Sequence, residues 1–270
     1  MPSIEGALLD FKRLDQLAMA DTTIHHLDPR AKVIVTLAFI VSVMSFGRYE
    51  LTVLVPFFIY PVVMATLGNL PPLYILKKIV LLCPFVLMVG VFNPVFDRAI
   101  LIQLGPIGIS GGWISFASII ARSVLTVSVA LILVGVTGFP AVCLALERLG
   151  MPKAFAVQLI FLYRYIFILT DEGVRMSTAR EMRSFGVKGL DIRTHGSLLG
   201  HFLLRTWLRA ERIHLAMLAR GFTGEFHTRN EFQFGKKEAL FLCVWLAVFV
   251  IFRFINISQM CGSLITGVMP

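Results

Sequence analysis

Residues 113–136 read WISFASIIARSVLTVSVALILVGV, an apolar run whose single charged residue is Arg122. A run of this length can cross the hydrocarbon core of a bilayer as one α-helix. The rest of the chain agrees, because 57% of its 270 residues are hydrophobic, only 15% are charged, and its mean hydropathy is +0.82. A soluble domain averages about half apolar and a quarter charged residues, so the sequence predicts an integral membrane protein.

Further apolar runs lie on either side of this stretch. Asp28-Pro29 is typical of a helix start, since Asp accepts a hydrogen bond from a first-turn amide and Pro fits the first helical position. The second run contains Pro56 and Pro61, which a membrane helix tolerates where neighbouring helices satisfy the freed carbonyls. The expected fold is all-α, a polytopic helical membrane protein with about five spans: residues 31–46, 51–67, 79–96, 113–136 and 239–255.

Lys and Arg are unevenly distributed along the chain, and the net charge is +9. Alternate connections between the expected spans are rich and poor in basic residues, as the positive-inside rule requires. The N-terminus and residues 139–237 are therefore expected to face the cytoplasm, and this placement argues against a nucleic-acid partner. The residues counted are four in 1–32, one in 47–50, two in 69–78, one in the expected loop 97–111 and 15 in 139–237.

The chain is expected to have three parts. Residues 1–138 form an N-terminal segment and four spans, residues 139–237 form helices in the cytoplasm or at the membrane boundary, and residues 238–270 form the last span and a tail. The middle part predicts a short helix and two long ones, at 140–149, 152–184 and about 194–220.

The first long helix contains an apolar run, residues 154–169, that is only marginally long enough to span a bilayer. Arg164 near its centre is costly in lipid, so we expect this run to lie at the membrane boundary. Each long helix then carries an apolar part and ends in water. On the second, Arg205, Arg209 and Arg212 share one face. Their pattern suits a solvated face or contact with anionic lipid as well as it suits a functional role.

Two short phrases end these long helices: Met182-Arg183-Ser184-Phe185-Gly186 and Ala219-Arg220-Gly221-Phe222-Thr223-Gly224. Each has Arg, then a small residue, then Phe. An arginine in the last turn followed by glycine is an ordinary helix ending, since the cation suits the negative end of the helix dipole. The repetition of the phrase in a basic region of a membrane protein favours a functional role.

Motifs for catalysis are absent from the sequence. It has no GxxxxGK[ST], HExxH or GxSxG motif and no Asp-rich pair. Four scattered cysteines and six histidines show no metal-ligand spacing, and the expected spans hold no Asp or Glu, which disfavours a self-sufficient carrier. Arg122 is therefore expected to face protein or water, with a partner on another subunit as one interpretation. No catalytic, cofactor-binding or metal-ligating residue is predicted.

The paired phrases resemble the transmembrane coupling (T) component of energy-coupling-factor transporters, ATP-driven importers whose substrate-binding protein is itself a membrane subunit. That family carries Ala-Arg-Gly, or a close variant, at the ends of two cytoplasmic coupling helices. Ala219-Arg220-Gly221 fits fully, and Met182-Arg183-Ser184 departs at its first position. The family is also similar in the entry segment His26-Leu27-Asp28-Pro29-Arg30-Ala31-Lys32, and the resemblance covers roughly residues 22–255. A further pair of segments is most similar to the cobalt-transport (CbiQ) branch: Leu146-Glu147-Arg148-Leu149-Gly150-Met151-Pro152 and Phe161-Leu162-Tyr163-Arg164-Tyr165.

The resemblance implies a non-enzymatic subunit in a bacterial or archaeal plasma membrane. Its partners would be membrane lipid, a membrane substrate-binding subunit for cobalt (nickel next), and two cytoplasmic ATPase subunits that carry ATP and Mg²⁺. The implied ATPase-coupling residues are Arg183, Ser184, Ala219, Arg220 and Gly221. The alternative is a membrane-embedded enzyme acting on a lipid or isoprenoid phosphate, with Arg205, Arg209 and Arg212 as phosphate clamps.

Overall fold

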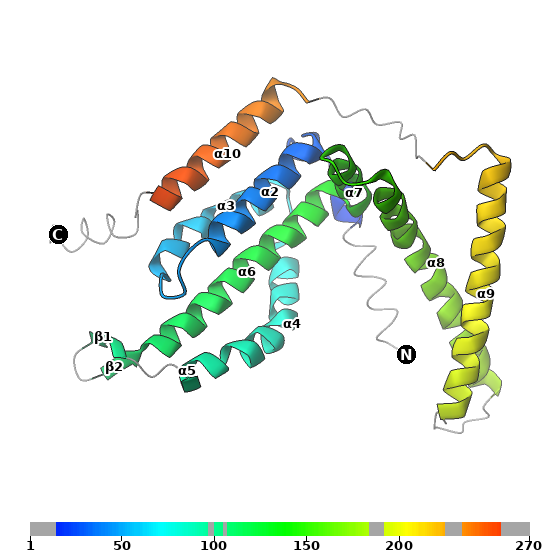
Figure 1. Ribbon diagram of the computed structural model, residues 1–270, viewed down its shortest axis with the longest axis horizontal. Coiled ribbons are helices and arrows are strands. Elements are labelled where there is room, and N and C mark those ends of the chain that lie inside the picture. The colour runs from blue at the N-terminus through cyan, green and yellow to red at the C-terminus, as the bar shows by residue number, and fades with distance from the viewer. Residues whose placement is uncertain (1–14, 97–99, 105–106, 184–191, 225–233, 255–270) are drawn as a thin grey trace. The chain divides into compact units, whose positions relative to one another are not determined.

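The computed structural model describes residues 15–96, 100–104, 107–183, 192–224 and 234–254. The chain divides into two compact units. The core unit comprises Leu14–Gly138 and Phe232–Pro270, and the helix-pair unit comprises Met1–Arg13 and Phe139–Glu231. The described residues are almost entirely helical, which confirms the all-α prediction, apart from one two-stranded hairpin. Elements are labelled as in Figure 1.

The core unit is built around the long helix α6, which packs against α2, α3, α4 and α5, while α10 packs against α2 (Figure 1). The hairpin lies at the start of α6. The elements of this unit are α2 (Pro29–Met44), the 3₁₀ turns η1 (Thr52–Leu54) and η2 (Pro56–Phe58), α3 (Ile59–Leu67), α4 (Pro72–Gly90), α5 (Phe92–Phe96), β1 (Ile100–Leu104), β2 (Ile107–Ser110), α6 (Gly111–Thr137) and α10 (Lys236–Phe254).

The helix-pair unit contains three helices in chain order. Helix α7 (Phe139–Arg148) packs against α8 (Lys153–Arg183), and α8 packs against α9 (Ile192–Ala219). At 1.5 Å per residue, the 31 residues of α8 extend about 46 Å and the 28 residues of α9 about 42 Å. These three helices match the three predicted for this region to within about two residues at each described end.

The start of α2 follows the sequence prediction. The Oδ1 atom of Asp28 accepts a hydrogen bond from the backbone N–H of Arg30 at 2.8 Å, and Pro29 is the first helical residue. Capping of this kind stabilises a helix by about 1 kcal/mol. Helix α2 therefore begins two residues before the span expected from hydropathy alone.

The second expected span is not one continuous α-helix. Residues 52–58 form two 3₁₀ turns, and α3 has only nine residues. Pro56 begins the second 3₁₀ turn and Pro61 lies in the first turn of α3. Each proline lacks an N–H donor and its ring clashes with the carbonyl four residues before it, so an unbroken α-helix through Pro56 is unfavourable.

The third expected span begins earlier than predicted, and the loop after it is partly ordered. Helix α4 starts at Pro72, so Lys77 and Lys78 lie within the helix rather than before it. Strands β1 and β2 pair antiparallel between α5 and α6, where the sequence analysis expected a loop. The loop was expected because the sequence there contains Gly105-Pro106 and Gly111-Gly112, but glycine-containing segments also connect the strands of hairpins.

Aromatic rings fill the centre of the core unit. Phe39 of α2 is fully buried, and its ring centroid lies 5.9 Å from that of Phe57, 4.9 Å from that of Tyr60 and 5.4 Å from that of Phe249 on α10. Tyr60 also meets Trp245 of α10 edge-on at 4.7 Å. Such offset and edge-to-face pairs add to the stabilisation from burial, so this cluster holds α2, α3 and α10 together.

Two glycines allow helices of the core unit to approach closely. A Cβ atom placed on Gly90 at the end of α4 would lie 2.7 Å from Cδ2 of Phe116 on α6. One placed on Gly68, which follows α3, would lie 2.8 Å from Cγ2 of Val136 on α6. Small residues at such contacts are typical of helix packing in membranes.

Three of the described helical segments are long and apolar enough to cross a membrane: Pro72–Pro94, Gly111–Thr137 and Lys153–Arg183. The first two coincide with predicted spans. The third is α8, which the sequence analysis placed at the membrane boundary. Residues 52–67 form a shorter apolar helical segment, α2 has 16 residues, and α10 carries charged residues near both its ends.

Candidate functional site

Helices α8 and α9 run antiparallel, and two contacts at different levels hold them together. Glu172 of α8 accepts a hydrogen bond from Nη1 of Arg205 on α9, with 3.0 Å between the charged atoms. Toward the other end, the ring of Phe161 on α8 lies 6.4 Å from that of Phe222, which follows α9. The segment that follows α9 thus turns back toward the first half of α8 (Figure 1).

The end of α9 has a defined geometry. The backbone N–H of Phe222 donates to the carbonyl of Met217 at 3.0 Å, and that of Gly221 donates to the carbonyl of Leu218 at 3.0 Å. Gly221 has a φ of 77°, in the left-handed region. These features define a Schellman motif in which Arg220 is the C-cap residue and glycine takes the position that suits it best. The same pair of bonds ends α7, with Gly150 in the corresponding position.

The five sequence-predicted coupling residues fall into two groups. Arg183 is the last residue of α8, and Ser184 lies outside the described residues. Ala219 is the last residue of α9, followed by Arg220 and Gly221, and the side chains of Arg183, Ala219 and Arg220 are exposed. Because the helices are antiparallel, Arg183 and Arg220 lie at opposite ends of the pair, separated along α9 by about 40 Å.

This separation differs from the sequence prediction, in which each arginine lies in water beyond the apolar part of its own helix. Arg183 does lie at the polar end of α8. Arg220 instead lies at the level where Phe161, in the apolar half of α8, meets Phe222. The sequence shows which residues end each helix, but the antiparallel pairing that sets the two ends apart is a tertiary property.

An apolar groove of about 930 Å³ runs between the two helices. Its walls include Phe161, Leu162 and Tyr165 from α8 and Leu203, Trp207 and Ile213 from α9. This volume lies within the range of about 300–1,000 Å³ that is typical of ligand pockets.

The apolar residues of both helices are unusually exposed. Ala156 is the only buried residue among the described side chains of α8, and α9 has none. Trp207 is 73% exposed. Exposed apolar side chains gathered on one pair of helices indicate a contact with lipid or with another protein.

A second groove of about 710 Å³ lies between the polar parts of the same helices. Four arginines and one histidine line it against a single acidic residue, Glu172, and they are Arg175, Arg180, Arg183, Arg205 and His201. The groove is thus strongly basic, and Arg183 is one of the residues that line it.

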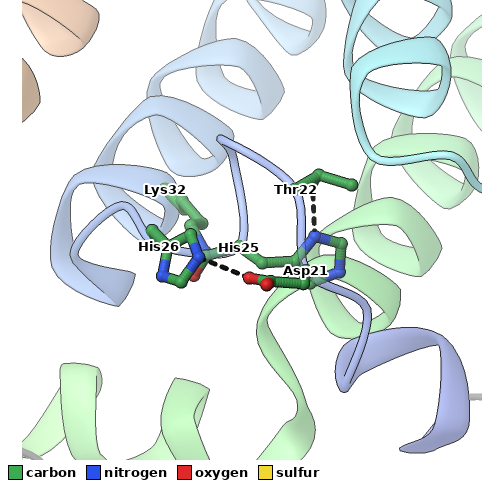
Figure 2. A network of polar contacts seen from close by, with 5 residues as sticks. All are labelled: Asp21, Thr22, His25, His26 and Lys32. Atoms are coloured by element: carbon green, nitrogen blue, oxygen red, sulfur yellow. Dashed lines mark hydrogen bonds and ion pairs between the residues drawn. The ribbon is translucent and has the colours of Figure 1, made fainter.

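The segment before α2 forms a compact polar network, shown in Figure 2. The Thr22 hydroxyl lies 2.6 Å from Nδ1 of His25, and Nε2 of His25 lies 3.1 Å from the carbonyl oxygen of Leu17. A neutral ring with its hydrogen on Nε2 satisfies both contacts. Burial lowers the pKa of His25, which favours that neutral form.

The remaining polar groups of Figure 2 point to a structural role for this segment. His26 pairs with Asp21 at 2.5 Å, apart from the contacts of His25. Nζ of Lys32, a residue only 1% exposed, donates to the carbonyl of His25 at 3.2 Å. Within the residues that the structure describes, no group of three or more His, Cys, Asp or Glu is placed to hold a metal ion.

Two arginines of the core unit converge on the turn after α2. Nη2 of Arg122 on α6 donates to the carbonyl of Gly47, and Nη2 of Arg253 on α10 donates to the carbonyl of Ser45 at 3.4 Å. The Arg253 guanidinium also lies 4.6 Å from the ring centroid of Phe46. Arg122 thus has an acceptor within its own chain, so the interpretation that assigned its partner to another subunit is not required.

The architecture is that of a helical membrane protein whose distinctive feature is an exposed pair of long helices with an arginine at each end. The family model described as "Cobalt transport protein" (CbiQ) matches residues 20–234, which includes both arginine phrases. The chain belongs to this family. It is a transmembrane component of a transport system.

Individual relatives are similar over much of the chain, and two of them carry transport names. An uncharacterized protein of Methanocaldococcus jannaschii is 27% identical over 75% of this chain and 72% of its own length. The cobalt transport protein CbiQ of Salmonella typhimurium is 29% identical over 52% of this chain and 68% of its own. The energy-coupling factor transporter transmembrane protein of Heliobacterium modesticaldum is 28% identical over 78% of this chain and 84% of its own.

Sequence reasoning missed three features of the candidate site. The aromatic contact between Phe161 and Phe222 joins residues 61 positions apart, and no local pattern signals it. The ion pair between Glu172 and Arg205 had a partial signal, because both residues lie near the middle of adjacent long helices that a short connection makes antiparallel. The apolar groove follows from the same pairing.

Proposed function

We propose that this chain is the transmembrane coupling subunit of an energy-coupling-factor importer, and that it transmits ATPase motion to a membrane substrate-binding subunit. The observation that carries the proposal is the antiparallel pair α8–α9, with one exposed arginine at each end. Membership of the cobalt transport family and the name of the Heliobacterium relative support it.

The ends of the helix pair would each bind one ATPase subunit. Arg183 and Arg220 are separated by about 40 Å along α9, so they cannot enter one groove of a single small partner. Two cytoplasmic ATPase subunits with one acidic groove apiece fit this spacing. Arginine suits such a contact because its guanidinium can pair with a carboxylate through two parallel hydrogen bonds.

The residues beside each arginine would fix its position. Gly221 allows the sharp turn after Arg220, Ala219 leaves room for a close approach, and Ser184 would correspond to Gly221 after Arg183. ATP and Mg²⁺ would be held by the ATPase subunits, and this chain would contribute no catalytic residue. Closure of those subunits around ATP would then move the two ends of the pair relative to each other.

The membrane substrate-binding subunit would contact the apolar face at the start of α8. Phe155 is 63% exposed and Ile166 is 40% exposed, and their spacing places them on the same side of the helix. We propose cobalt as the transported ion, with nickel next, because the family model and the Salmonella relative carry the cobalt description. The ion would bind to the substrate-binding subunit and not to this chain.

The proposed topology places the N-terminus and both arginine ends in the cytoplasm of a bacterial or archaeal cell, with about five crossings. Helix α8 is long enough to cross the membrane, but a crossing would place Arg183 and Arg220 on opposite sides. Both could not then meet cytoplasmic ATPase subunits. We therefore propose that α8 lies along the membrane boundary.

The test is a pair of charge reversals in the full chain, co-expressed with its candidate ATPase and substrate-binding subunits. Arg183→Glu combined with Arg220→Glu should abolish co-purification of the ATPase subunits and leave membrane insertion unchanged. Arg48→Glu combined with Lys77→Glu makes the same change in net charge away from the helix pair, and ATPase subunits should still co-purify. Unchanged co-purification in the first variant would overturn the proposal.

A second measurement tests the topology. Single cysteines replace residues next to Arg183 and Arg220 in a cysteine-free background, and intact cells are treated with a thiol reagent that does not cross the membrane. Neither cysteine should be labelled until the cells are opened. Labelling of one of the two in intact cells would show that α8 crosses the bilayer and would refute the shared cytoplasmic location.

A further inference from the structure

The basic residues beside the apolar groove suggest a ligand with both a long apolar part and a negative charge. A small pocket of about 270 Å³ is lined by Glu172, Arg205, Thr206, Leu208, Arg209 and Arg212. It shares Thr206 and Arg209 with the apolar groove, and Glu172 and Arg205 with the basic groove. The apolar groove therefore leads directly into a site lined by arginines.

The charge of the small pocket is not neutralised by the chain itself. Glu172 is occupied by Arg205. For Arg209 and Arg212, no carboxylate lies within ion-pairing distance among the residues that the structure describes. Nε of Arg212 donates to the carbonyl of Leu208 at 3.2 Å, which leaves its two terminal nitrogens for a ligand. Two adjacent guanidinium groups are well suited to a phosphate.

The dimensions and composition of the apolar groove fit hydrocarbon. Along α8 its lining runs from Gln158 to Leu169, eleven residue steps or about 16 Å. An acyl chain that extends through one leaflet is about 15 Å long, half of the bilayer core, so the groove can hold one along its length. Trp207, in the same wall as Arg209, is strongly exposed, and tryptophan is enriched at the level of lipid headgroups.

From these observations we propose that the helix pair holds an anionic phospholipid, with its acyl chains in the apolar groove and its phosphate on Arg209 and Arg212. Charge complementarity decides the occupant. A purely apolar protein helix would leave the arginines without partners, and a zwitterionic lipid would bring no net charge to them. The site would tie the helix pair to the anionic cytoplasmic leaflet, and it does not depend on any ATPase subunit.

The test uses the fluorescence of Trp207 and phospholipids brominated on their acyl chains, because bromine quenches tryptophan on contact. The purified full chain is reconstituted in nanodiscs of unlabelled phosphatidylcholine that contain a small fraction of brominated phosphatidylglycerol or, in a parallel sample, of brominated phosphatidylcholine. The quenching lost in Trp207→Phe isolates the signal of this residue from Trp113 and Trp245. We expect selective quenching of Trp207 by phosphatidylglycerol.

Matched variants locate the headgroup. Arg209→Gln combined with Arg212→Gln should lower the apparent affinity for brominated phosphatidylglycerol at least about tenfold, since both guanidinium groups act near an anionic headgroup. Lys236→Gln combined with Lys237→Gln removes two cations at the start of α10 and should leave the affinity unchanged. Equal quenching by the two lipids, or selectivity that survives the arginine replacements, would overturn the proposal.

Two further arms exclude other occupants. Excess inorganic phosphate at constant ionic strength should not displace the brominated lipid, and displacement would assign the pocket to free phosphate. The selective quenching should also persist in the complex purified with its partner subunits. Its loss there would show that a protein segment fills the groove in the assembly, which would refute a resident lipid.

Discussion

The core unit and the helix-pair unit both carry many apolar side chains but bury them differently. In the core unit, the side chains of Phe39 and Phe57 are completely buried within one aromatic cluster. In the helix-pair unit, Trp207 and Leu199 remain largely exposed, and no described side chain of α9 is buried. The core unit satisfies its own packing, whereas the helix pair presents surface to lipid and partners.

The largest expected effect comes from truncating the centre of the aromatic cluster. Phe39→Ala removes a fully buried ring in contact with three others, and it should lower the free energy of unfolding by about 3–5 kcal/mol. Leu199→Ala on α9, at a side chain that is 59% exposed, should change it by no more than about 0.5 kcal/mol.

Both variants can be measured on the full chain in detergent micelles, by denaturant titration followed with circular dichroism. The comparison between the two units predicts a large difference between the two midpoints. Losses of similar size would mean that α9 is packed as tightly as α2, which would contradict the difference in burial between the two units.

An intermediate effect, of opposite sign in the two units, is expected from replacing glycines. Gly90→Ala would place a Cβ 2.7 Å from the ring of Phe116, so it should destabilise the core unit by about 1–3 kcal/mol. Gly196 on α9 has open space where its Cβ would be, and Gly196→Ala should stabilise that helix by up to about 1 kcal/mol. The same titration measures both, and equal signs would contradict the comparison.

The smallest expected effect is the pH dependence of the network before α2. Burial lowers the pKa of His25, so the unfolded chain binds this proton more readily than the folded one. The stabilisation that neutral His25 contributes to the folded state is fully present above the unfolded-state pKa of about 6.5. It is lost as the pH falls toward the pKa of the folded state.

This pH dependence of stability bears on the comparison of the two units because His25 belongs to the core unit. The melting temperature of the wild type should fall between about pH 7.5 and about pH 5.5, and His25→Gln should reduce that fall. A wild-type slope that persists in full in His25→Gln would reject the role assigned to this histidine.

Features that depend on neighbouring residues in the sequence were predictable. Asp28 caps α2, and glycine ends α7, because capping and left-handed turns are decided within a few residues. The apolar runs likewise identified most of the helices. Pro56 could have indicated a break in the second span, but membrane helices tolerate proline, so a continuous helix was predicted. In the structure Pro56 begins a 3₁₀ turn, because its ring clashes with the carbonyl four residues before it in an α-helix.

Features that depend on pairing between distant segments were not predictable from one sequence. The arginine phrases were identified as helix ends, yet their placement at opposite ends of the pair follows from antiparallel packing of α8 and α9. The acceptor for Arg122 was missed for the same reason, since the carbonyl of Gly47 lies 75 residues away. Every residue has a backbone carbonyl group, so the sequence does not indicate which one accepts a hydrogen bond from a distant side chain. Such an acceptor is identified only in the folded structure.

The point at which α9 ends, at the turn formed by Gly221, also determines the direction of Arg220 relative to the groove. Since α9 advances about 100° per residue, adding one residue within it would rotate Arg220 by that angle relative to the groove and would draw Phe222 away from Phe161. Adding a full turn of residues would nearly restore the direction but displace the tip by about 5.4 Å. The length of α9 therefore fixes both the position of Arg220 along the helix axis and the direction in which its side chain points.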